Sequence, residues 1–324
     1  MKIQNLIISL FLIWFVPSEI AFAQYTSESI YTAARAGNLE SINSFIKKGI
    51  NKQTLNNALG AAVAGEQIET MDVLIKNGAD VNHLSSFNTS LLNNAIMLGF
   101  HRSAAKLIES GADPNVYGFK RKERNFLIDW SWTPLMCAAY KGNKELVELL
   151  LKSGADAKLN GWSNSPNDIE TAADIAAYKG HLDILKILIK NDSPVNPETI
   201  FKTARGGHIE TFKYLMKNEK NPDRLGKNNK TLLMEACWWG QIDIVNLLLK
   251  KKAKVNFKNT DGRTALIEVV SNPDRDLKVQ FEIVKYLTKH GADTTIAVNG
   301  KTALDIAKDN NKKNIVTFLA GTKK

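Results

Sequence analysis

The feature that most constrains this 324-residue chain is a short sequence that returns along it. Gly-Ala-Asp is found at residues 78–80, 111–113, 154–156 and 291–293, with degenerate copies at 49–51, 193–196 and 253–256. A short alanine-rich segment that ends at glycine comes before a longer segment with helical apolar periodicity, as in residues 138–151. A period of about 33 residues is typical of arrays whose repeats bury their apolar faces only against one another. We therefore expect one stacked core over residues 24–324.

The repeats also carry the signals that start and stop helices. A Thr or Ser before an apolar segment caps a helix start, and a glycine after the segment supplies the left-handed residue at which the chain reverses. These signals predict a repeated helix–turn–helix unit.

The sequence Trp132-Thr133-Pro134-Leu135-Met136 resembles the ankyrin repeat, whose first helix usually starts with Thr-Pro-Leu-His. The resemblance extends over most of the chain and implies an all-α fold, an ankyrin-repeat solenoid of about nine helix–turn–helix repeats with hairpin fingers. It places the starts of the first helices near Glu28, Asn56, Ser90, Thr133, Thr171, Glu198, Thr231, Thr264 and Thr302. The histidine after leucine is missing throughout. Because that histidine usually holds the hairpin against the helices, individual repeats are expected to be less rigid than is usual in the family.

The first 23 residues have the pattern of an export signal. Lys2 is followed by the apolar run 6–16 and then by small residues at Ala21 and Ala23, which predicts a signal peptide over residues 1–23 with Gln24 as the first mature residue. The run is shorter than the roughly 18 apolar residues of a spanning helix, so no transmembrane segment is expected after cleavage. An uncleaved anchor is the alternative, and in both cases the body is exported.

Three segments depart from the repeat spacing: 118–131, 160–170 and 271–280. The first two are expected to lengthen hairpins, and the third to lie between the two helices of the eighth repeat. Insertions in a solenoid fall on loops of one face, which often make the contacts. The alternative interpretation is that these insertions have no function and are merely tolerated by the fold.

The chain has no recognisable catalytic or metal-binding motif. His181 and His208 follow glycine at helix turns, where turn packing explains them, and the other three histidines lack a second ligand at metal-binding spacing. There is no phosphate-binding loop, nucleophile elbow or dinucleotide fingerprint. We therefore expect no enzyme activity, no cofactor and no metal.

The two cysteines, Cys137 and Cys237, are expected in first helices three repeats apart. At roughly 10 Å per helix layer their separation is about 30 Å, far beyond the reach of a disulfide. We predict buried thiols. An intermolecular or redox role is the alternative, because unpaired cysteines are unusual in an exported protein.

The aromatic residues give the clearest indication of a function. In the geometry that the resemblance implies, the two residues before the glycine between paired helices face the concave groove, and the hairpin fingers lie on the same side. Tryptophan, tyrosine and arginine dominate binding hot spots. The predicted partner-binding surface consists of Trp130, Trp132, Tyr140, Lys141, Trp162, Tyr178, Lys179, Arg205, Trp238 and Trp239. For individual members, packing between repeats is the alternative.

The charge of the chain favours an anionic partner. It has 43 Lys and Arg residues against 33 Asp and Glu residues, a formal net charge of +10. Nucleic acid is not expected, because export separates the chain from it and no recognition motif is present. An acidic protein or an anionic envelope polymer is the better match.

These observations together predict an exported, monomeric and non-catalytic scaffold that binds a protein partner through its groove and fingers. The Lys- and Asn-rich composition and the cleavage site suggest a bacterium, with the periplasm as the location and secretion as the alternative. Two narrower alternatives are an immunity or inhibitor protein for a toxin or envelope enzyme and an effector secreted into a host. A binder of anionic envelope polysaccharide belongs to a different class, and its affinity would fall more steeply with salt.

Overall fold

The computed structural model describes residues 29–84, 89–118, 131–162, 169–217, 219 and 221–322. The predicted signal peptide, its cleavage residues and most of the 118–131 insertion lie outside these residues. The chain divides into two compact units. Unit 1 consists of residues 1–172 and 191–193, and unit 2 of residues 173–190 and 194–324. Each unit is described by itself below.

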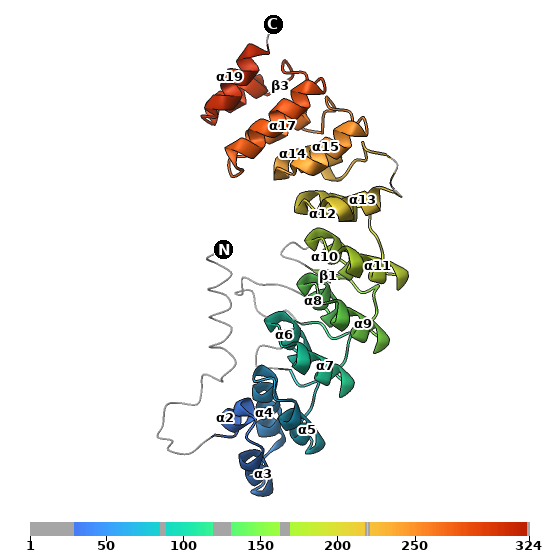
Figure 1. Cartoon of the computed structure of the whole chain (residues 1–324), viewed down its shortest axis with the longest axis vertical. Coiled ribbons are helices and arrows are strands. Elements are labelled where there is room, and N and C mark those ends of the chain that lie inside the picture. Colours follow the sequence, from blue (N-terminus) through green and yellow to red (C-terminus); the bar gives the residue numbers. More distant parts are fainter. Residues whose placement is uncertain are drawn as a thin grey trace. The chain divides into compact units, whose positions relative to one another are not determined.

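The described part of unit 1 is a series of helix pairs (Figure 1). The pairs are α2 (Ile30–Ala36) with α3 (Leu39–Lys47), α4 (Lys52–Ala64) with α5 (Ile68–Lys76), α6 (Leu91–Leu98) with α7 (His101–Glu109), and α8 (Pro134–Lys141) with α9 (Lys144–Lys152). A short hairpin of β1 (Gly161–Trp162) and β2 (Ile169–Glu170) follows, with Gly161 opposite Glu170. The 160–170 insertion is therefore a lengthened hairpin, as predicted.

Unit 2 continues the same arrangement after α10 (Ala172–Lys179), whose first residue belongs to unit 1. Its helices are α11 (Leu182–Lys190), α12 (Thr199–Gly206), α13 (Ile209–Met216), α14 (Leu232–Trp239), α15 (Ile242–Lys250), α16 (Ala265–Ser271), α17 (Leu277–Lys289), α18 (Ala303–Asp309) and α19 (Lys313–Gly321). A 3-10 turn, η1 (Lys227–Asn229), precedes α14, and a hairpin of β3 (Ala297–Val298) and β4 (Lys301–Thr302) precedes α18. The described residues thus contain nine helix pairs, the number predicted.

Caps and glycines bound these helices for the expected physical reason. The Thr133 hydroxyl accepts a hydrogen bond from the Met136 amide at 3.4 Å, with Pro134 in the first turn of α8. Thr231, Thr264 and Thr302 cap their helices in the same way. The reversals use left-handed glycines such as Gly142 (φ 73°) and Gly240 (φ 75°). The sequence signals for helix ends are confirmed at these positions.

One predicted helix start and one predicted loop boundary are wrong by several residues. Helix α4 begins at Lys52 rather than near Asn56, because the Asn51 side chain caps it by accepting from the Thr54 amide at 2.8 Å. Helix α17 begins at Leu277, so the connection inside the eighth repeat ends at Asp276 and not at Gln280. In both cases an Asn or Asp cap extends the helix in the N-terminal direction.

The core of each unit lies between two layers of helices. In unit 2, α12, α14, α16 and α18 pack in succession, and α13, α15, α17 and α19 form a second row. Alanines at the contacts, including Ala204 and Ala236, are fully buried and let neighbouring first helices approach closely. The second row contributes buried leucines such as Leu248 and Leu287. This packing is what an all-α repeat array requires.

The Gly-Ala-Asp turns are joined by asparagine side chains. Within one turn, the Asp113 carboxylate accepts from the Asn115 amide at 2.8 Å. The Asn115 side chain then bonds the next turn, donating to the Gly154 carbonyl at 3.0 Å and accepting from the Asp156 amide at 2.8 Å. The carboxylates of these turns are therefore turn formers, as predicted, and the asparagine two residues later connects adjacent repeats.

Both cysteines are buried and free. Burial raises the pKa of the Cys137 thiol to about 12, and it raises the pKa of Cys237 as well. The prediction of buried thiols is confirmed. Among the described residues there is no group of three metal-ligating side chains, and none of the helices is both long and apolar enough to cross a membrane.

Candidate protein-contact site

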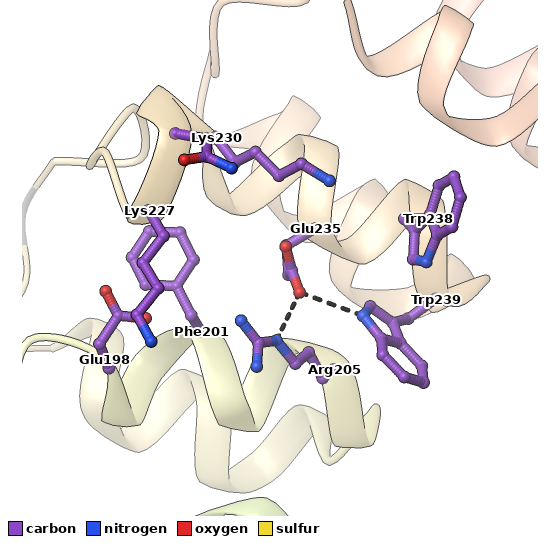
Figure 2. A pocket seen from close by; sticks show the side chains of 9 residues that line it. Glu198, Phe201, Arg205, Lys227, Lys230, Glu235, Trp238 and Trp239 are labelled. Carbon is purple, nitrogen blue, oxygen red and sulfur yellow. Dashed lines mark hydrogen bonds and ion pairs between the residues drawn. The ribbon is translucent and has the colours of Figure 1, made fainter. Parts of the chain in front are cut away.

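A pocket of about 270 Å³ opens in unit 2 between α12 and the turn and helix that follow it (Figure 2). We call it the α12–α14 pocket. Two tryptophans and a phenylalanine supply apolar walls, and charged side chains supply the rest. The lining residues are Glu198, Phe201, Arg205, Lys227, Asn228, Lys230, Glu235, Trp238 and Trp239.

Trp238 and Trp239 reach this pocket because they end α14. The preceding residues of the helix, from Leu232 to Cys237, are all buried between neighbouring helices. The left-handed Gly240 then reverses the chain. Both indoles are half-buried at the end of the helix, so one part of each ring packs while another part stays accessible.

Polar contacts fix the Trp239 indole. Its Nε1 donates to the Glu235 carboxylate at 3.1 Å, one helical turn earlier. The Arg275 guanidinium lies over the ring at 4.7 Å from the centroid. A tryptophan held at its N–H and over one face of its ring loses little freedom when it binds a partner, which lowers the cost of binding.

The same carboxylate also holds Arg205. The Arg205 Nε donates to Glu235, and the Arg205 carbonyl accepts from the Gln241 side chain at 2.7 Å. The Glu235 residue is only 7% exposed. A nearly buried carboxylate therefore fixes both Arg205 and Trp239 at the pocket wall.

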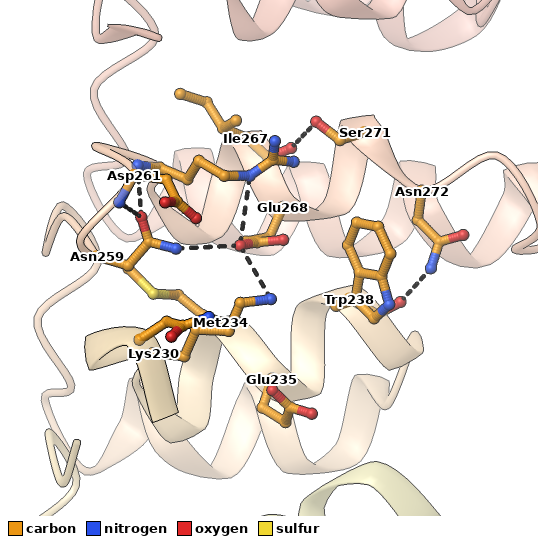
Figure 3. Close-up of polar contacts among 12 residues, drawn as sticks. Lys230, Met234, Glu235, Trp238, Asn259, Asp261, Ile267, Glu268, Ser271 and Asn272 are labelled. Atoms are coloured by element: carbon orange, nitrogen blue, oxygen red, sulfur yellow. Dashed lines mark hydrogen bonds and ion pairs between the residues drawn. The ribbon is translucent and has the colours of Figure 1, made fainter. Parts of the chain in front are cut away.

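Trp238 belongs to a second polar cluster (Figure 3). Lys230 Nζ lies 5.4 Å from the centre of the Trp238 ring and 3.3 Å from the Glu268 carboxylate. Glu268 is 1% exposed, and Arg263 Nε pairs with it at 3.4 Å. Such a buried carboxylate is tolerated because two cations and the Asn259 side chain surround it.

The connection between α16 and α17 supports this cluster from the other side. The Asn272 side chain donates to the Trp238 carbonyl at 2.7 Å. Lys312 in turn donates to the Asn272 carbonyl at 2.7 Å and to Gln280 at 2.5 Å. Burial lowers the pKa of Lys312 to about 8. The last repeat is thus linked through Asn272 to the backbone of Trp238 in the seventh repeat.

The predicted contact residues of unit 1 have mixed outcomes. Trp132 is 6% exposed, and its ring packs against Tyr140 with the centroids 5.2 Å apart, so it is not the exposed contact residue that was expected. It supports Tyr140, which is half-buried beside the exposed Lys141. Trp130 and the side chain of Trp162 lie outside the described residues.

The predicted contact residues of unit 2 remain accessible. Tyr178 is 44% exposed, and Lys179, Arg205, Trp238 and Trp239 are half-buried. Of these, Arg205, Trp238 and Trp239 lie together at the α12–α14 pocket. His208 packs at the turn after α12 as expected, and burial together with His181 lowers its pKa.

Sequence reasoning missed the two carboxylates that organise the site. Glu235 and Glu268 each stand four residues after the capping threonine of a first helix, inside the apolar segments Leu232–Cys237 and Ala265–Val270. A lone carboxylate within such a segment is a signal, since buried Glu is rare unless paired. The basic partners were not recognisable, because they come from the preceding hairpin or the neighbouring repeat.

A family model described as Ankyrin repeats (3 copies) matches residues 30–118, 119–199, 175–259 and 253–324. The chain belongs to the ankyrin repeat family. Ankyrin repeats form scaffolds for protein–protein interaction and are generally non-catalytic. The family assignment, the all-α fold and the scaffold role expected from the sequence therefore hold.

Curated relatives share this ankyrin region over part of the chain. This chain is 33% identical to Ankyrin repeat and SAM domain-containing protein 6 of Rattus norvegicus over 120 residues. The aligned segment covers 36% of this chain and 13% of that protein. The chain is 27% identical over 197 residues to Ankyrin repeat and KH domain-containing protein mask-1 of Caenorhabditis elegans, over 58% of this chain and 7% of that protein. A Schizosaccharomyces pombe glycerophosphocholine phosphodiesterase is 29% identical over 12% of its length. The chain thus spans a small part of these relatives.

Proposed function

We propose that this ankyrin repeat protein is exported to the periplasm and there binds a protein partner, without catalysis, through unit 2. The contact surface is the face formed by the last turns of α10, α12 and α14, with Tyr178, Arg205, Trp238 and Trp239. One observation carries this assignment. Two adjacent tryptophans stay partly accessible at a pocket although polar contacts hold the Trp239 ring in place.

Export rests on residues 1–23 and is tested separately. The short apolar run followed by Ala21 and Ala23 supports cleavage before Gln24. We expect the intact mass of protein recovered from the periplasmic fraction to correspond to a chain that starts at Gln24. A full-length mass in the membrane fraction would instead show an anchored protein.

The contact surface is tested with the double variant Trp238→Ala and Trp239→Ala. The partner is first captured by crosslinking from envelope extract, identified and purified. We expect the double variant to bind it at least about 30-fold more weakly, the equivalent of about 2 kcal/mol, because tryptophans at hot spots contribute that much. Affinity and thermal unfolding are measured on the same samples.

The control is Leu277→Ala, which removes a 55% exposed apolar side chain from the same unit. This variant should bind the partner normally. If the tryptophan variant loses its cooperative unfolding while its remaining folded fraction binds normally, the tryptophans are packing residues and the contact surface lies elsewhere.

A further inference from the structure

The net positive charge of the chain comes from unit 2. That unit holds 27 of the 43 Lys and Arg residues and 16 of the 33 Asp and Glu residues, a net charge of +11. Unit 1 has a net charge of −1. The field of unit 2 therefore attracts an acidic partner, while unit 1 contributes almost nothing to that attraction.

Arg205 has the geometry of an anion receptor within this unit. Its Nε is bonded to Glu235, which fixes the plane of the guanidinium. Figure 2 shows the two terminal nitrogens directed away from Glu235, toward the side of the pocket where Phe201 and Lys227 lie. A guanidinium binds a carboxylate best through a fork of donors, and here the fork is oriented before any ligand arrives.

The other charges around the pocket leave a net preference for an anion. Arg205, Lys227 and Lys230 line it together with Glu198 and Glu235, which gives three cations and two carboxylates. Glu235 already accepts from Arg205 and Trp239, so its charge is directed into the wall. The neighbouring Glu268 does not line the pocket, but it pairs with Lys230 at 3.3 Å and with Arg263 at 3.4 Å, so counting Glu268 and Arg263 with the lining residues leaves their net charge at +1.

The apolar walls restrict the form that this anion takes. Phe201 and the two indoles border the same space as the cations. A free inorganic ion would leave these surfaces in contact with water, whereas a carboxylate on a short aliphatic stem covers them. A glutamate side chain on an extended peptide has both parts.

We propose that the α12–α14 pocket binds a carboxylate side chain from an acidic segment of the protein partner, with Arg205 as the residue that determines specificity. This inference rests on the proposed function and names the chemistry of the segment that unit 2 recognises. Trp238 and Trp239 contact the stem and backbone of that segment, and Arg205 binds its carboxylate.

The test uses fluorescence anisotropy with a labelled peptide of five Glu-Gly repeats, blocked at both ends, at about 150 mM salt. A Gln-Gly peptide of the same length is the neutral counterpart, and a uronate oligosaccharide supplies carboxylates without a peptide backbone. Arg205→Lys keeps the positive charge but removes the fork. We expect it to weaken binding of the Glu-Gly peptide at least about fivefold.

Lys251→Met is the matched charge control, since it removes one exposed cation at the end of α15, outside the pocket residues. It should weaken binding less than about twofold. Three outcomes would overturn the inference: a loss in Arg205→Lys no larger than the loss in Lys251→Met, equal binding of the Gln-Gly peptide, or equal Arg205-dependent binding of the uronate. The proposed function itself fails only if the purified partner binds the Trp238/Trp239 double variant normally, so the two failures are distinguishable.

Discussion

Replacing Gly206 with alanine is expected to destabilise unit 2 by about 3 kcal/mol, measured by urea unfolding. Gly206 is the last residue of α12, where alanine would ordinarily favour the helix by about 1 kcal/mol. A β-carbon at this position, however, would lie within 3.0 Å of the Tyr178 carbonyl oxygen and of the His208 ring. Because the carbonyl belongs to the backbone of α10, the clash requires the two helices to separate.

Gly291→Ala is the matched control in the same unit. Gly291 has a left-handed φ of 85°, but nothing lies within 4 Å of an added β-carbon. Its replacement should cost only about 1 kcal/mol, the penalty for an alanine in that conformation. If Gly206→Ala were the less destabilising of the two, close approach of α10 and α12 would not be what requires glycine at position 206.

The equivalent glycine in unit 1 shows why such positions escape sequence analysis. A β-carbon at Gly65 would meet the Arg35 carbonyl, just as one at Gly206 meets Tyr178. Gly65 caps the end of α4, and Gly206 is the last residue of α12. Each glycine is therefore already explained by the sequence as a residue that stops a helix. The stronger constraint on both glycines is the backbone of the preceding repeat, about 30 residues earlier in the chain. A local sequence pattern carries no information about that contact.

Helix boundaries, by contrast, depend on contacts within a few residues and were largely predictable. The threonine caps at Thr133, Thr231 and Thr264 act on amides three residues later. The error at α4 has the same origin, because Asn51 is an equally good cap that the alignment of repeats did not consider. Capping interactions between residues close in the sequence therefore set the helix boundaries at these positions.

The candidate site was predictable only in its position. Trp238 and Trp239 were found because residues before the turn glycine occupy a fixed place in each repeat. The burial of Trp132 was not predictable, since it depends on the packing of its ring against Tyr140. Likewise the partners of Glu268 come from outside its helix, with Lys230 before α14 and Arg263 before α16.

Removing both cations from Glu268 is expected to have an effect as large as that of the glycine variant. The double variant Lys230→Met and Arg263→Met leaves a carboxylate that is 1% exposed with the Asn259 side chain at 3.5 Å. An uncompensated buried charge of this kind costs about 3 kcal/mol. We expect the free energy of unfolding of unit 2, measured by urea unfolding, to fall by that amount.

A third substitution, Glu268→Met, separates the charge from the packing. Placed on the double variant, it replaces the unpaired carboxylate by an apolar side chain of similar length, and most of the lost stability should return. The control double variant Lys213→Met and Lys285→Met breaks two exposed ion pairs and should cost less than about 1 kcal/mol. If the triple variant is no more stable than the double, the lysine and arginine stabilise unit 2 through their aliphatic stems, and Glu268 does not require pairing. Recovery would show that the carboxylate has to be neutralised, which ties the hairpin before α14 to α16 and thereby holds Lys230 beside Trp238.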